Sequence, residues 1–173
     1  SLGDTLIIVK NIYKIQTVSI NYDQKNQNIY SSEDVNMEDN ENNYYSLKDG
    51  FRFDLTREIV KSKKSYILDS NDNKYIFDDL AINLKTNEII GKEIKIEFED
   101  SFFGNKNNDP ALKGSSIISN DKNTKIFKTV FSTCNAENKS CRGWELQSEL
   151  FTHNKLEKLF EYKKSWLKVF DKK

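Results

Sequence analysis

Alternation of apolar and polar residues constrains this chain more than any other feature. In residues 93–99, Ile94, Ile96 and Phe98 alternate with charged residues without a break. Successive side chains of an extended chain point to opposite faces, so the three apolar side chains share one face of a strand. Clean alternation is typical of antiparallel sheets with one solvated face, whereas buried parallel strands are apolar throughout. The pattern therefore predicts an all-β, antiparallel fold.

The same alternation recurs along the chain, in residues 18–22, 51–55, 74–78 and 144–146. Apolar spacing that would also fit a helix occurs only in residues 155–164. Because β-branched and aromatic residues surround that segment, we interpret it as a hairpin as well.

Polar turns interrupt the strands at regular intervals, their first residues being 31, 29, 37 and 33 positions apart. Asn and Asp suit such turns because they tolerate left-handed backbone angles and bond their own main chain. The turns are Asp23-Gln24-Lys25, Asp54-Leu55-Thr56, Asn83-Leu84-Lys85, Asn120-Asp121-Lys122 and His153-Asn154-Lys155. A unit of about thirty residues predicts stacked hairpins. The spacing fits a closed sandwich, a solenoid or an open jellyroll equally well.

Length and composition narrow the class of protein. A chain of 173 residues is expected to form a single domain, spanning residues 1–173. Its net charge is zero, which gives no reason to expect nucleic acid as a partner. It contains no run of 18 apolar residues, and its first ten residues lack the layout of a secretory signal.

Motifs for catalysis are absent from the sequence. There is no G-x-S-x-G elbow, phosphate-binding loop, dinucleotide fingerprint or calcium loop. His153 is the only histidine and lies in a predicted turn, so it has no set of metal ligands around it. We therefore expect a protein that is not an enzyme, with no catalytic residues, no metal and no cofactor.

Two cysteines, Cys134 and Cys141, flank a short polar loop. We expect a local disulfide between them across a hairpin loop. Two free thiols, or a bond to a cysteine outside this sequence, are the alternatives.

The last third of the chain carries a distinctive order of features. An Asn108-Asp109-Pro110 turn is followed by Lys113-Gly114 and by a strand ending at Cys134, within Phe-Ser-Thr-Cys. A loop with the second cysteine, a strand led by Trp144, a His-Asn turn and two strands rich in aromatic residues and lysine follow. This order resembles the OstA-like family, which includes the N-terminal periplasmic domain of the lipopolysaccharide-assembly protein LptD. Cys134 matches the family cysteine that is linked to a C-terminal barrel, whereas the second cysteine departs from that pattern.

The resemblance implies a V-shaped β-jellyroll of stacked hairpins with open edge strands. It implies a domain at the periplasmic face of the outer membrane of a Gram-negative bacterium, which binds lipopolysaccharide and passes it to an outer-membrane β-barrel. The implied partners are lipopolysaccharide, a periplasmic jellyroll bridge protein paired edge to edge, and the barrel with its lipoprotein plug. The barrel itself is expected beyond this sequence.

The candidate lipid-binding groove consists of apolar side chains that alternation places on the inner faces. They are Phe51, Phe53, Tyr75, Phe77, Ile94, Ile96, Phe98, Trp144 and Leu146. Trp166 and Phe170 are expected to point inward too. Removing an acyl methylene from water contributes about 0.8 kcal/mol, so an apolar trough is sufficient for binding. The same alternation would equally fill an ordinary sandwich core.

Two alternatives to this function remain. The domain could be a soluble periplasmic bridge or an inner-membrane-anchored jellyroll of the same transport system. It could also be a β-solenoid adhesin or polysaccharide-binding module, whose interior would be closed and dry.

Overall fold

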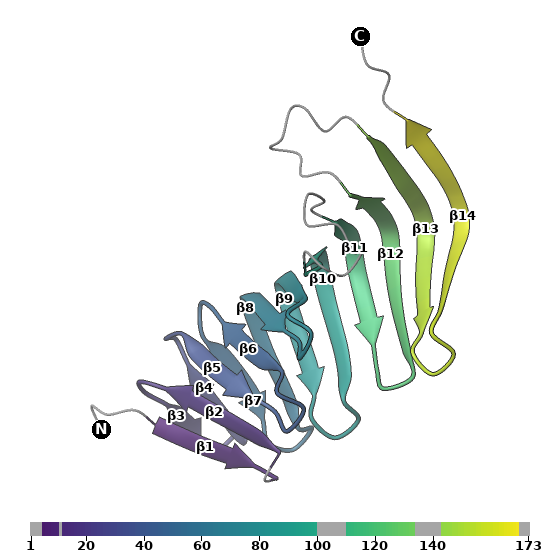
Figure 1. Ribbon diagram of the computed structural model, residues 1–173. Helices are drawn as coiled ribbons and strands as arrows, with labels where there is room; N and C mark the ends of the chain where they lie inside the picture. The colour runs from purple at the N-terminus through teal and green to yellow at the C-terminus, as the bar shows by residue number, and fades with distance from the viewer. Residues whose placement is uncertain (1–4, 11, 100–109, 134–142, 170–173) are drawn as a thin grey trace.

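The computed structural model describes residues 5–10, 12–99, 110–133 and 143–169, which form fourteen β-strands joined in one antiparallel sheet (Figure 1). The sheet is open and curved, and it confirms the predicted all-β, antiparallel jellyroll. No helix in the described part of the chain is long and apolar enough to cross a membrane.

The strands fall into two groups by length. Seven short strands come first, namely β1 (Thr5–Val9), β2 (Tyr13–Thr17), β3 (Asn21–Asp23), β4 (Asn28–Ser31), β5 (Val35–Glu38), β6 (Tyr44–Leu47) and β7 (Phe51–Asp54). Seven long strands follow, namely β8 (Ile59–Leu68), β9 (Lys74–Asn83), β10 (Glu88–Glu97), β11 (Ala111–Ser119), β12 (Asn123–Ser132), β13 (Trp144–Asn154) and β14 (Leu159–Val169).

The sheet divides into two arms at β8. Residues 59–62 of β8 pair with β7, residues 65–68 pair with β6, and β9 pairs along the whole strand. Arm A contains β1, β2, β5, β6, residues 65–68 of β8, and the half of each strand from β9 to β14 that continues the ladder from those residues. Arm B contains β3, β4, β7, residues 59–62 and the remaining halves of β9–β14. Each long strand thus contributes to both arms, which gives the V shape.

A bend at one level of every long strand forms the corner of the V. The ladder between β8 and β9 skips one residue on each strand there, resuming at Ser65 opposite Phe77. At this level β8, β10, β12 and β14 have a residue with positive φ, between 45° and 51°. They are Lys64, Glu93, Lys128 and Lys164. Left-handed backbone is uncommon outside glycine, so its recurrence on alternate strands marks a built-in kink.

The same corner continues through the short strands as turns. Gly50, between β6 and β7, has φ +83°, and a Cβ there would come within 2.1 Å of the Ser31 carbonyl oxygen. Only glycine fits this close approach of two chain segments. The alternation in residues 18–22 predicted a strand through this level, which was wrong. Residues 18–20 form the corner before β3, and Val18 is 54% exposed.

All five polar turns predicted from the sequence join strands at the free end of arm B, which confirms the repeat of hairpins. In each turn an Asp or Asn side-chain oxygen accepts backbone N–H groups two or three residues further on. The Oδ1 atoms of Asp54 and Asn120, for example, accept such bonds at 2.9–3.0 Å. The same arrangement occurs at Asp23, Asn83 and Asn154.

Arm A carries a second repeated turn that the sequence analysis missed. Asp39 and Asp69 each bond an Asn four residues later and the hydroxyl of a Tyr six residues later. The Tyr45 hydroxyl donates to Asp39 Oδ2 at 2.7 Å, and burial is the main reason that its pKa is raised. The motif, Asp-x-x-x-Asn-x-Tyr, recurs after thirty residues and was visible in the sequence.

Contacts between turns close the two arms over the core in the N-terminal part of the molecule. Lys10, between β1 and β2, forms an ion pair with Glu58, between β7 and β8. The Tyr13 hydroxyl donates to Asn87 Oδ1 at 3.3 Å, again from arm A to arm B. The core between these contacts is fully shielded, with Ile15 and Met37 at 0% exposure.

We predict that Gly91→Ala destabilises the domain by about 1–3 kcal/mol through overpacking. A Cβ at this position would lie 2.4 Å from the ring of Phe77, which is buried and has no room to move. Urea unfolding followed by circular dichroism measures the change. The exposed Lys125→Ala on β12 is the control and should stay within about 0.5 kcal/mol. Equal stability of the two variants would contradict the packing described here.

Candidate lipid-binding face

An unbroken row of apolar side chains crosses arm A from the first strand to the last. Each member lies directly opposite the next in the strand ladders, one residue per strand. The row is Ile7, Ile15, Met37, Tyr45, Ile67, Tyr75, Ile96, Leu112, Phe131, Leu146 and Leu167. It faces the interior of the V, because its central members are buried.

Burial of this row falls off towards the C-terminal strands. Leu112 on β11 is 2% exposed, and Phe131 and Leu146 on the next two strands are partly buried. Leu167 on β14 is 60% exposed, and its neighbour Val169, opposite Trp144, is 65% exposed. The inner face is therefore shielded near the N-terminus, partly shielded at β13 and uncovered at β14.

Aromatic side chains continue the uncovered face on arm B. The Phe151 ring lies 5.1 Å from that of Tyr162 and 5.7 Å from that of Phe160, measured between centroids. The His153 ring lies 4.5 Å from that of Phe160. Partial burial lowers the pKa of His153, and the nearby Lys155 lowers it further. The imidazole therefore belongs to an apolar cluster and favours its neutral form.

Arm A has a matching aromatic cluster. The rings of Phe98 and Phe131 are 6.4 Å apart and meet edge to face, and those of Phe131 and Trp144 are 5.7 Å apart. We define the C-terminal apolar face as Trp144, Leu146, Phe160, Tyr162, Leu167 and Val169. Its members lie on β13 and β14 in both arms, with the inward Ser148 and Ser165 between them at the bend.

Unpaired strand edges flank the sheet at both ends. Within the described residues, β14 pairs only with β13, and β1 pairs only with β2 (Figure 1). The free edge of an eleven-residue strand presents a row of backbone donors and acceptors, which a strand of another protein can satisfy. At β14 this edge lies beside the C-terminal apolar face.

The structure places all nine predicted groove residues on the inner faces. Five of them are buried in the core between the arms, namely Phe51, Phe53, Phe77, Ile94 and Ile96. The other four are partly buried, namely Tyr75, Phe98, Trp144 and Leu146. Only Trp144 and Leu146 belong to the C-terminal apolar face, so the predicted set extends from the closed core to its open end.

The expectation that Trp166 points inward was wrong. Its side chain lies on the outer face, is 53% exposed, and donates from Nε1 to Gln147 Oε1 at 2.9 Å. The bend at Lys164 is the reason. Inward positions along β14 advance by two residues, except across the bend, where they advance by three, from Tyr162 to Ser165. Counting in twos through the bend selects Trp166, whereas the inward residue is Leu167.

Sequence reasoning missed the four members of the C-terminal apolar face on β14, and the bend accounts for two of them, Leu167 and Val169. The same step of three between inward residues occurs in β8–β13. The sequence contains a signal for it, because the residue skipped by the ladder at the bend of each strand is polar. The predicted disulfide cysteines, Cys134 and Cys141, and the predicted inward Phe170 lie outside the described residues.

No family model matches this chain, and no curated protein matches it either.

We predict that acidification destabilises the domain partly through His153. Its folded-state pKa is lowered, so the unfolded chain takes up the proton first and stability falls as the pH drops through about 6.5. The stability that the neutral imidazole contributes is fully present above that range. Unfolding free energies at pH 7.5 and 5.5 should fall more for the wild type than for His153→Gln. An equal loss in both proteins would contradict the prediction, since carboxylates titrate in both.

Proposed function

We propose that this domain binds the acyl chains of lipopolysaccharide on the inner face of its V and passes the lipid to neighbouring β-structure. One observation carries the proposal. The apolar row of arm A runs through every strand of that arm and ends exposed, at Leu167, beside an unpaired edge. An apolar row that ends at an open edge can be continued by a second sheet.

The energetics of such binding require only apolar contact. Each acyl methylene removed from water contributes about 0.8 kcal/mol, and a buried Leu side chain contributes about 1.5–3 kcal/mol. Neighbouring strands are about 4.8 Å apart, so an acyl chain lying across the strands passes one row member per strand. The C-terminal apolar face offers these contacts without any movement. Between β2 and β11 the row is covered, and passage there requires the arms to separate.

The choice of lipopolysaccharide as the lipid, and of the outer membrane as the place, rests on the resemblance to the OstA-like family. In this proposal the sugars stay in water at the free ends of the arms while the acyl chains lie between them. One edge strand pairs with a periplasmic jellyroll bridge protein, and the chain delivers lipid to an outer-membrane barrel with its lipoprotein plug. The transfer is physical, with no bond made or broken.

We predict that photo-crosslinking to lipopolysaccharide separates inner from outer positions on the C-terminal strands. A photoreactive amino acid at Leu146 or Leu167 should give adducts. The outer neighbours Gln147 and Lys168 serve as controls and should give none. Phe53 is a further labelled position. Its side chain is only 3% exposed, so it should react only if arm A and arm B separate. Adducts at inner and outer positions alike would contradict the proposal, and so would the absence of adducts at every position.

We also predict that Leu167→Asp weakens binding of lipopolysaccharide at least about tenfold. The variant removes a Leu contact and places a charge on the apolar face, and tenfold corresponds to ~1.4 kcal/mol. The matched control is Leu159→Asp, which makes the same change on the outer side of the same strand, where Leu159 is 48% exposed. Affinities from fluorescence displacement and melting temperatures should be measured for both. Equal affinity of the two folded variants would contradict the proposed face.

A further inference from the structure

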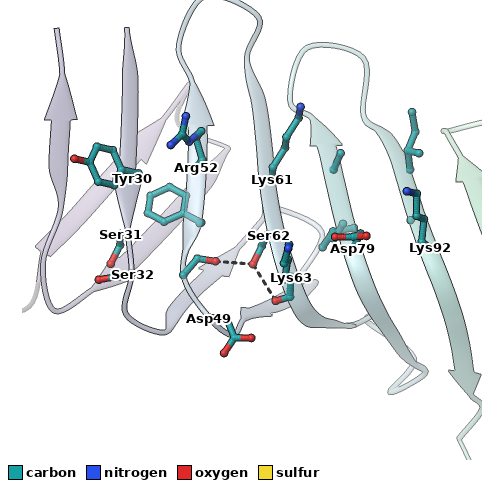
Figure 2. A pocket seen from close by; sticks show the side chains of 16 residues that line it. Tyr30, Ser31, Ser32, Asp49, Arg52, Lys61, Ser62, Lys63, Asp79 and Lys92 are labelled. Carbon is teal, nitrogen blue, oxygen red and sulfur yellow. Dashed lines mark hydrogen bonds between the residues drawn. The ribbon is translucent and has the colours of Figure 1, made fainter. Parts of the chain in front are cut away.

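A hollow on the outer face of arm B has no role in the proposed lipid binding, which uses the inner face. Strands β4, β7, β8, β9 and β10 form it, and its volume is about 630 Å³ (Figure 2). It faces outward because Arg52 and Lys61 are exposed while their strand neighbours Phe51 and Ser62 are buried. Small-molecule sites occupy roughly 300–1,000 Å³, so the hollow has the size of a ligand site.

The charges that line this hollow are mostly positive. Four cationic side chains, from Arg52, Lys61, Lys63 and Lys92, face two carboxylates. One carboxylate, Asp49, forms an ion pair at 3.5 Å with Lys64, outside the lining. The other, Asp79, lies opposite both Lys63 and Lys92 in the strand ladders. In a chain with a net charge of zero, this concentration of cations favours an anionic ligand.

The pairing of Arg52 with Lys61 is the strongest indication of a ligand. The two residues lie directly opposite each other on β7 and β8, and Figure 2 shows both at the hollow. Like charges in this arrangement destabilise a sheet. Among the described residues no carboxylate forms an ion pair with either of them, and the Arg52 guanidinium lies 5.8 Å from the centroid of the Tyr30 ring. Asp23 is near enough for Arg52 to lower its pKa, but hydrogen bonds from Asn26 are the larger cause. A bound anion would turn this repulsion into attraction.

We propose that the hollow binds a phosphate monoester carried on a sugar. Arg52 and Lys61 hold the phosphate, since guanidinium and ammonium groups are the common phosphate ligands of proteins. A bare phosphate fills only a small part of the volume. The space over Ala81, which lies opposite Lys61 on the next strand, accommodates the sugar, and the Asp79 carboxylate on the same strand accepts hydrogen bonds from its hydroxyls. The site lies on the opposite face of the sheet from the apolar row and does not depend on the proposed lipid binding.

The test is a titration of the purified domain with glucose 1-phosphate at low ionic strength. Separate titrations use inorganic phosphate and glucose under the same conditions. Calorimetry gives the affinities, and amide chemical shifts give the location. We expect glucose 1-phosphate to bind at least about fivefold more tightly than either partial ligand. The shifted signals should belong to residues 50–52, 61–63, 79–81 and 90–92.

Two double variants with the same loss of charge locate the effect. Arg52→Gln with Lys61→Gln should weaken binding at least about tenfold. Lys113→Gln with Lys125→Gln, both at exposed outer positions away from the hollow, should leave the affinity unchanged. Equal losses in the two variants would overturn the proposal, because binding would then follow net charge alone. Equal affinity for inorganic phosphate would overturn the sugar assignment, and binding only to phosphatidylglycerol vesicles would make the surface a membrane contact.

A ligand-free measurement tests the repulsion separately. Lys61→Gln removes one of two opposed like charges, so its melting temperature at low salt should exceed that of the wild type. An unchanged or lower melting temperature would remove the reason for expecting an anion between Arg52 and Lys61. Neither readout involves the inner face, so failure here leaves the lipid-binding proposal to its own crosslinking test.

Discussion

The bend shared by the long strands is the constraint on which the rest of the structure depends. Side-chain direction alternates with every residue of a strand. If the spacing between inward residues stayed at two across the bend, polar side chains would point towards the core of the second arm. The single step of three at the bend restores the pattern, as from Phe77 to Leu80 in β9. Left-handed backbone at Lys64, Glu93, Lys128 and Lys164 costs roughly 1–2 kcal/mol at each residue. Burial of the apolar rows of both arms offsets that cost.

Closure of the V is graded along the molecule. Near the N-terminus the turns of the two arms touch, through Lys10 with Glu58 and Tyr13 with Asn87, and the core between them excludes water. At the other end the last strand has apolar residues on its inner side that remain exposed, as Leu167 does. One sheet thus combines a rigid, filled core with an uncovered apolar face, and the same in-register row connects them. The buried N-terminal core therefore stabilises the domain, whereas the exposed apolar residues of the last strand are accessible to a ligand.

Much of the fold follows from local sequence, and the residues show why the remainder does not. Alternation placed Ile94 and Ile96 correctly because both lie on one side of the bend, and Asn or Asp at the turns located the hairpins through their own hydrogen bonds. Trp166 was misplaced because the bend changes the count. Whether an inward residue fills the core, as Phe53 does, or remains uncovered, as Leu167 does, depends on the opposite arm. Contacts so distant in sequence leave no mark on the alternation.

The order of strands has a consequence for how the chain reaches this structure. From β8 to β14 every strand pairs with the next one along the chain, whereas β2, β4 and β6 pair with strands beyond their immediate successors. Pairing between successive strands closes short loops and is kinetically fast, whereas distant pairing is slow. The C-terminal meander can therefore form hairpin by hairpin and present the exposed edge of β8 as a template. The N-terminal strands pair with two separate halves of that edge, β7 with residues 59–62 and β6 with residues 65–68, so closing the branch requires the more distant pairings.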